Sequence, residues 1–146
     1  KFTMTILNFE YLYKKYGNGI HKKVELDLRS LKITEIDHKT FANLKNIQKL
    51  SLSDNQLQSI DANLFANLND LKILELDRNQ LQSIDANLFA NLINLKRLYL
   101  DLDLLRIADK KRQENLVKHL VKLELISNDG FKYPPENFID EFLIFM

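Results

Sequence analysis

The side chains that could carry out chemistry are few in this sequence, and their spacing does not suit catalysis. Cysteine is absent, which removes disulfides, thiolate metal ligands and cysteine nucleophiles together. The three histidines, His21, His38 and His119, show no HxH or HExxH spacing that would present two ligands to one metal ion. We therefore expect no metal site and no cofactor.

Other catalytic patterns are missing as well. Asp101 and Asp103 would point to the same side of a strand, but no histidine, serine or third acid has a matching spacing. The only glycines are Gly17, Gly19 and Gly130, so the chain cannot form a glycine-rich loop around a phosphate. The sequence therefore predicts a protein that is not an enzyme.

The composition is that of a globular domain with a single core. The chain has 146 residues, of which 45% are hydrophobic and 28% charged. Its 21 basic and 20 acidic residues nearly cancel and form no long basic block, so nucleic acid is not an expected partner. No stretch approaches the roughly 20 consecutive apolar residues that span a bilayer. We predict one domain over residues 1–146.

The cellular compartment and the natural start of the chain stay open. The chain begins at Lys1 rather than methionine, which fits either removal of a leader or a fragment of a longer protein. A secreted or extracellular location is favoured over a cytoplasmic one.

The elements that would position the side chains come from an internal repeat. The fourteen letters NQLQSIDANLFANL occur at 55–68 and again at 79–92, an offset of 24 residues. Laid over the flanking residues, this period aligns apolar side chains in columns, each predicted to point into a common core. The columns are Leu26, Leu50, Leu74 and Leu98; Leu28, Leu52, Leu76 and Leu100; Ile33, Leu57, Leu81 and Leu105; Ile36, Ile60, Ile84 and Ala108; Phe41, Phe65 and Phe89; and Leu44, Leu68 and Leu92.

These units resemble the leucine-rich-repeat family in its 24-residue form, LxxLxLxxNxLxxIxxxxFxxLxx, without cysteine-rich caps. The phrase NQLQSI is also similar to the variable lymphocyte receptors of jawless fish, but the cysteines that staple the caps of those proteins are absent. The resemblance covers residues 24–128. A fifth unit follows if the fourth, which includes a predicted helix over 107–121, has one extra residue.

The resemblance implies an α/β solenoid of about five repeats. Each unit would contribute one short strand to a parallel sheet on the concave face, followed by an asparagine ladder at Asn55 and Asn79. The ladder position is Leu31 in the first unit and Asp103 in the fourth, where we expect local irregularity. The phenylalanine column would stack as a spine on the convex side.

Segments on both sides of the repeats are predicted to close the ends of the solenoid. Residues 1–23 would form an N-terminal helical cap, with a helix over 7–16 that ends at Gly17 and Gly19. Residues 129–146 would form a C-terminal cap. Their apolar side chains could alternatively contact a second copy or another domain.

Solvent-facing strand positions are where solenoids of this family usually contact partners, so the resemblance implies binding of another protein. Alternation predicts the facing residues Glu25, Asp27, Arg29, Lys49, Ser51, Ser53, Ile73, Glu75, Asp77, Arg97, Tyr99, Asp101, Lys122, Glu124 and Ile126. The partner-binding candidates among and beside them are Arg29, Lys49, Ile73, Glu75, Asp77, Arg78, Arg97, Tyr99, Asp101, Lys122 and Glu124.

Tyr99 among charged neighbours has the composition that is enriched at binding hot spots. The simpler interpretation of the same residues is a solvated sheet face. In that alternative the chain is a structural or scaffold element that contacts its neighbours through the caps and the convex helix.

Overall fold

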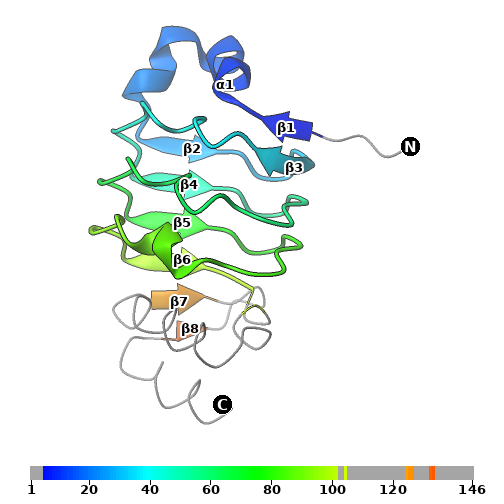
Figure 1. Ribbon diagram of the computed structural model, residues 1–146. Coiled ribbons are helices and arrows are strands. Elements are labelled where there is room, and N and C mark those ends of the chain that lie inside the picture. Colours follow the sequence, from blue (N-terminus) through cyan, green and yellow to red (C-terminus); the bar gives the residue numbers. More distant parts are fainter. Residues whose placement is uncertain (1–4, 102–103, 105–123, 127–131, 134–146) are drawn as a thin grey trace.

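The structure, a computed structural model, describes residues 5–101, 104, 124–126 and 132–133 (Figure 1). Within these residues, the chain winds through stacked turns that each contribute one strand to the same sheet. The elements in chain order are β1 (Thr5–Leu7), α1 (Phe9–Tyr16), the 3-10 helix η1 (Gly17–Lys22), β2 (Glu25–Asp27), β3 (Ile33–Ile36), β4 (Lys49–Ser51), β5 (Ile73–Glu75), the 3-10 helix η2 (Ala86–Phe89), β6 (Arg97–Tyr99), β7 (Glu124–Ile126) and β8 (Lys132–Tyr133).

The main sheet has the strand order β2-β4-β5-β6-β7-β8. Its strands are parallel from β2 to β7, and β8 pairs antiparallel with β7. Glu25 pairs with Lys49, Lys49 with Ile73, and Ile73 with Arg97. This register confirms the 24-residue unit for the first four strands.

The register of the fifth strand differs from the prediction. Arg97 pairs with Glu124, a separation of 27 residues, whereas one extra residue in the fourth unit would have paired Arg97 with Lys122. The prediction was wrong by two residues. Because side chains alternate along a strand, a shift of two leaves Glu124 on the same face of the sheet.

The core lies behind the sheet, between the strands and the returning convex segments. The two leucine columns from the strands are no more than 1% exposed, as their alternation predicts. Phe41 and Phe65 are fully buried, and their rings stack with centroids 6.2 Å apart and an angle of 28° between their planes. Phe89 is 5% exposed. The phenylalanine column is therefore part of the core, as predicted.

Asn55 satisfies backbone groups where the chain leaves the sheet. Its Oδ1 accepts hydrogen bonds from the backbone N–H groups of Leu31 (3.0 Å) and Ile33 (3.1 Å), while its Nδ2 donates to three carbonyl oxygens. Asn79 repeats the pattern one unit later, accepting from the N–H of Leu57 at 3.1 Å. These contacts confirm the asparagine ladder.

Left-handed backbone conformations mark the same exits from the strands. Ser30, Asp54 and Arg78 have φ of 56°, 56° and 57°, although none of them is glycine. Lys32 adds a fourth positive φ of 57° beside Leu31, where the first unit has no ladder asparagine. The irregularity expected at Leu31 is present.

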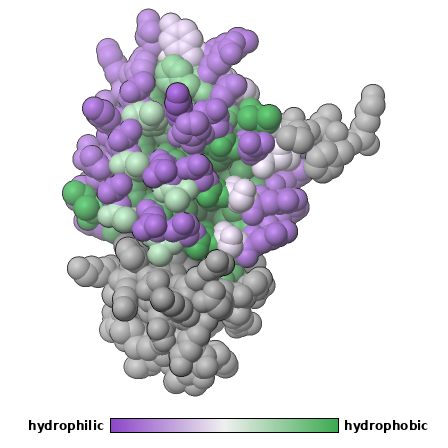
Figure 2. Space-filling model, viewed as in Figure 1, coloured by the Kyte–Doolittle hydropathy of each residue, from purple (hydrophilic) through white to green (hydrophobic). Residues whose placement is uncertain are grey.

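The N-terminal segment lies against the first repeat unit. Asn8 caps α1 by accepting a hydrogen bond from the N–H of Tyr11 at 2.9 Å, and Leu12 and Ile20 are fully buried. Leu7 was expected in the helix, but it belongs to β1, which pairs in parallel with β3. β1 and the 3-10 helix η1 were not predicted. Figure 2 shows hydrophilic residues over much of the α1 end.

Two predicted elements cannot be compared with this fold. The helix over 107–121 lies outside the described residues, as does the predicted C-terminal cap apart from β8. Among the helices of the described part, none is long and apolar enough to cross a membrane.

Candidate partner-binding surface

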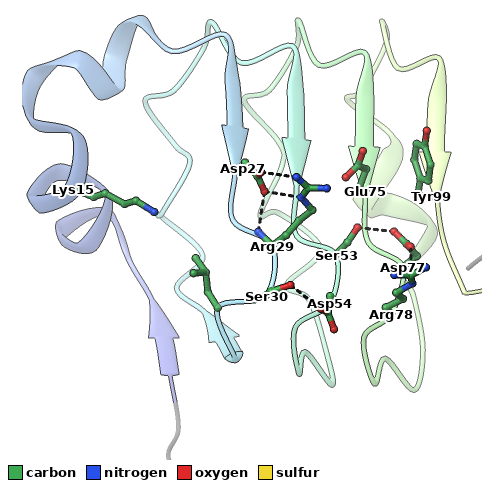
Figure 3. Close-up of a pocket in the computed structure, with 11 residues that line it drawn as sticks. Lys15, Asp27, Arg29, Ser30, Ser53, Asp54, Glu75, Asp77, Arg78 and Tyr99 are labelled. Atoms are coloured by element: carbon green, nitrogen blue, oxygen red, sulfur yellow. Dashed lines mark hydrogen bonds and ion pairs between the residues drawn. The ribbon is translucent and has the colours of Figure 1, made fainter.

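The concave face, meaning the side of the main sheet opposite the leucine columns, carries a hollow of about 560 Å³ (Figure 3). Residues of β2, β5 and β6, of the turns that follow β2, β4 and β5, and of α1 contribute to it. Its lining residues are Lys15, Asp27, Arg29, Ser30, Leu31, Ser53, Asp54, Glu75, Asp77, Arg78 and Tyr99.

Serine hydroxyls hold the carboxylates of the next unit in place. Ser30 donates to Asp54 and Ser53 donates to Asp77, each at 2.6 Å and each across 24 residues. Ser51 donates to Glu75 in the same way. One hydrogen bond satisfies only part of the acceptor capacity of an ionised carboxylate. The serines therefore orient these carboxylates while leaving further acceptor positions on each.

Three positions predicted to face solvent are buried. Ser51, Ser53 and Asp77 are 3%, 7% and 9% exposed. They do lie on the concave face, but the hydrogen bonds between units draw neighbouring side chains together over them. Alternation gives the side of the sheet on which a residue lies, and the bulk of its neighbours decides its exposure.

Ion pairs cross the remainder of the face. Arg29 binds Asp27 through two side-chain hydrogen bonds of 2.9 and 2.8 Å, and this contact lowers the pKa of Asp27 from 3.8 to about 2. The ammonium of Lys49 lies 3.7 Å from a Glu75 carboxylate oxygen. At the other end of the sheet, Arg97 donates to Glu124 at 3.2 Å.

Asp101 stabilises the preceding turn. Its two carboxylate oxygens accept hydrogen bonds from the backbone N–H groups of Arg78 (2.9 Å) and Asn79 (3.3 Å). The prediction placed Asp101 among the partner-binding residues without this role. A carboxylate that already accepts from two backbone donors has less capacity left for a partner.

Tyr99 stands beside Glu75 in the strand register, and its side chain is half-buried. Within the described part of the chain, its ring and hydroxyl make no hydrogen bond or ring contact. Ile73 is half-buried on the neighbouring strand, diagonally across from Tyr99. The centre of the face thus presents an aromatic and an aliphatic group among charged side chains.

Part of the repeat region matches a known family. Residues 24–81 match the family described as "Leucine rich repeat". These units are leucine-rich repeats. Among curated proteins, no sequence matches the chain at a significant level.

Solved structures show the leucine-rich-repeat fold for most of the chain. The leucine-rich repeat domain of APL1B matches with a TM-score of 0.60 and 24% identity, over 87% of this chain and 36% of that one. A chain from the Toll–Spatzle complex, described as a molecular hub in Drosophila development and innate immunity, matches with a TM-score of 0.59 and 23% identity. That match covers 84% of this chain and 16% of the other. This chain therefore spans much less than the full length of either structure.

The leucine-rich-repeat sheet brings most of the predicted site residues together. Arg29, Glu75, Asp77, Arg78 and Tyr99 line the hollow, and Lys49 contacts Glu75. Ile73 of β5 and Arg97 of β6 lie beside it. Asp101 follows β6 in the chain, and Glu124 is in β7, the next strand of the sheet. Lys122 lies outside the described residues.

Lys15, Ser30, Leu31 and Asp54 line the hollow but were not predicted. Ser30, Asp54 and Arg78 share one position of the 24-residue period, so the inclusion of Arg78 could have pointed to the other two. Lys15 comes from α1, and no spacing within the repeats points to it.

Proposed function

We propose that this chain is a non-catalytic module that binds another protein through the concave face. The observation that carries the proposal is the hollow, where oriented carboxylates lie beside a tyrosine with no partner in the described part of the chain. Tyrosine and arginine are enriched at the centres of protein interfaces, and both occur here. The similarity to Toll, whose structure was solved with Spatzle, supports the same kind of role.

The arrangement of side chains favours binding over catalysis. The carboxylates of the face accept from serine hydroxyls, from Arg29 or from backbone N–H groups. His21 lies in η1 and His38 in a convex turn, so neither adjoins these carboxylates. The described residues contain no group of three or more histidines and acids that could hold a metal ion.

The proposal treats residues 1–146 as one domain. Residues 1–23 would close the N-terminal end, 24–128 would form the repeats, and 129–146 would close the C-terminal end. The full burial of Leu12 and Ile20 against the first unit supports the first of these assignments.

The test begins with isolation of the partner on the immobilised chain of residues 1–146. Dissociation constants for that partner are then measured with Tyr99→Ala and Arg97→Glu. Loss of a hot-spot side chain costs about 2 kcal/mol or more, so Tyr99→Ala is expected to weaken binding by roughly thirtyfold. Lys45→Glu is the matched control for Arg97→Glu, because Lys45 is exposed and lies outside the main sheet.

If Tyr99→Ala and Arg97→Glu bound the partner as tightly as the unchanged chain and the Lys45→Glu control, the concave face would be rejected as the binding surface. If changes at Phe142 or Ile139 then abolished binding, the structural or scaffold alternative would replace the proposal. Both of those positions lie outside the described residues.

A further inference from the structure

We propose that the concave face binds an arginine or lysine side chain from an extended segment of the partner protein, between Asp77, Glu75 and Tyr99. This inference rests on the proposed function, because it takes the concave face as the binding surface. It adds the chemical character of the partner and the position of its anchoring residue.

The negative charge of the hollow is only partly matched within the chain. The tight pair formed by Asp27 and Arg29 accounts for one carboxylate. The carboxylates of Asp54, Glu75 and Asp77 accept hydrogen bonds from neutral serine hydroxyls, and Glu75 and Asp77 each also have one cation within 4 Å. The Nζ of Lys49 lies 3.7 Å from a Glu75 carboxylate oxygen, and the Nε of Arg78 lies 3.9 Å from one of Asp77. Both distances exceed normal hydrogen-bond length. A closer cation would therefore gain a charge-assisted hydrogen bond.

Lys15 is the remaining cation in the lining of the hollow. Its ammonium lies 5.4 Å from the centre of the Tyr16 ring, at the α1 end. Figure 3 shows it separated from Asp77 and Tyr99 by the first repeat units. It therefore does not neutralise the carboxylates at the β5 end.

Arg78 is a weak occupant of the position beside Asp77. Its side chain is 65% exposed, its Nε lies 3.9 Å from Asp77, and its backbone has a φ of 57°. The Arg78 side of this ion pair is exposed and its N–O distance is longer than a hydrogen bond, so the pair contributes little to stability. A partner cation can therefore displace the Arg78 side chain from Asp77 at small cost.

Tyr99 and Ile73 complete the site. A cation held by Asp77 and Glu75 would lie next to the Tyr99 ring, whose face attracts positive charge. Ile73 offers an apolar contact nearby, which a free cation could not use and a polypeptide segment could. These two side chains favour a segment with an apolar residue next to its arginine or lysine.

Charged residues are also unevenly distributed along residues 8–101, with an excess of acidic residues in the part that contains Glu75 and Asp77. Residues 8–52 carry nine lysines and arginines against five aspartates and glutamates. Residues 53–101 carry seven aspartates and glutamates against four lysines and arginines. Such an asymmetry steers a partner during its approach, so a cationic side chain would be drawn toward the β5 and β6 end.

The test uses the acetylated, amidated tetrapeptide alanine-leucine-arginine-alanine and a second peptide with citrulline in place of arginine. Citrulline keeps the shape of arginine and removes its charge. Each peptide is titrated into the ¹⁵N-labelled full chain and followed by NMR. The arginine peptide is expected to shift the amide signals of Ser53, Glu75, Asp77 and Tyr99, with the citrulline peptide about tenfold weaker.

Three variants sharpen the measurement. Asp77→Asn keeps the oxygen that accepts from Ser53, so the fold should be retained while affinity for the arginine peptide falls about tenfold. Arg78→Gly removes the cation that competes for Asp77 and suits the positive φ, so affinity should rise roughly two- to fivefold. Lys45→Gln, outside the hollow, should leave affinity unchanged.

Equal binding of the two peptides, or unchanged affinity in Asp77→Asn, would overturn the inference. Free argininamide that bound as tightly as the peptide would reject the protein segment as the ligand. Tyr99→Ala could weaken binding of the isolated partner while the arginine and citrulline peptides bound equally well. In that case the concave face would remain the binding surface, and recognition of a cation would be rejected.

Discussion

Replacement of the ladder asparagine in the second unit tests how the repeats are joined. In Asn55→Ala, the N–H groups of Leu31, which is half-buried, and of Ile33, which is buried, lose the oxygen that accepts from them. Among the carbonyls that lose a donor, Leu52 still accepts from Asn79, and Ser53 still accepts from the N–H of Ser30. The loss is thus dominated by two orphaned donors and the carbonyl of Leu28.

Each buried donor left without an acceptor costs about 1–3 kcal/mol, so Asn55→Ala should lower the free energy of unfolding by about 3–5 kcal/mol. Asn79→Ala should cost roughly half as much, because only the N–H of Leu57 loses its acceptor and Asn79 is partly exposed. Urea denaturation followed by circular dichroism measures both. Asn91→Ala, at an exposed convex position, is the control and should stay within about 0.5 kcal/mol.

The ladder reasoning would be refuted if Asn55→Ala cost no more than Asn91→Ala. It would also be refuted if Asn79→Ala were the more costly of the two ladder changes. Either result would mean that other groups or water satisfy the backbone at the strand exits.

Three further predictions concern the convex side and the ion pair. Phe65→Ala should lower the free energy of unfolding by about 3–5 kcal/mol in a thermal melt, since its ring is fully buried, whereas Ile93→Ala, at a side chain 79% exposed, should change it little. Asp70→Asn should raise the free energy of unfolding by about 0.5 kcal/mol, measured in urea. Asn46 and Asn94 occupy the same position one unit before and one unit after Asp70, and each donates a hydrogen bond to the carbonyl 25 residues earlier, which an aspartate cannot do. An unchanged midpoint of urea denaturation would count against a hydrogen bond from the introduced amide. The lowered pKa of Asp27 means that its contribution to stability is present above pH 4 and is lost as the pH falls toward 2; Arg29→Gln should return this pKa toward 3.8 in an NMR titration.

The sequence was informative about the fold wherever the 24-residue period held. It predicted the leucine columns, the phenylalanine spine, the ladder asparagines and the pairing of the first four strands. It was wrong at β7, because the fourth unit no longer repeats and the length of its return segment cannot be read from aligned columns. It missed β1, which pairs with β3 outside the main sheet.

The surface was less predictable than the core. Alternation places Asp77 on the concave face, but its burial depends on the hydrogen bond from Ser53 in the preceding unit. The role of Asp101 depends on hydrogen bonds from backbone N–H groups one unit earlier, and residue types alone do not predict such contacts. The left-handed backbone of Arg78 also lacks its usual sequence signal, which is glycine.

The hydrogen bonds from serine to carboxylate across 24 residues make the order of the units matter. Residues 55–68 and 79–92 are identical, so the convex side and the core would tolerate loss or duplication of one unit. The concave residues differ from unit to unit, and loss of the third unit would place Ser51 beside Tyr99 and Ser53 beside Asp101. Unequal exchange between these identical segments could therefore create a new binding surface in one event while the packing behind it stayed the same.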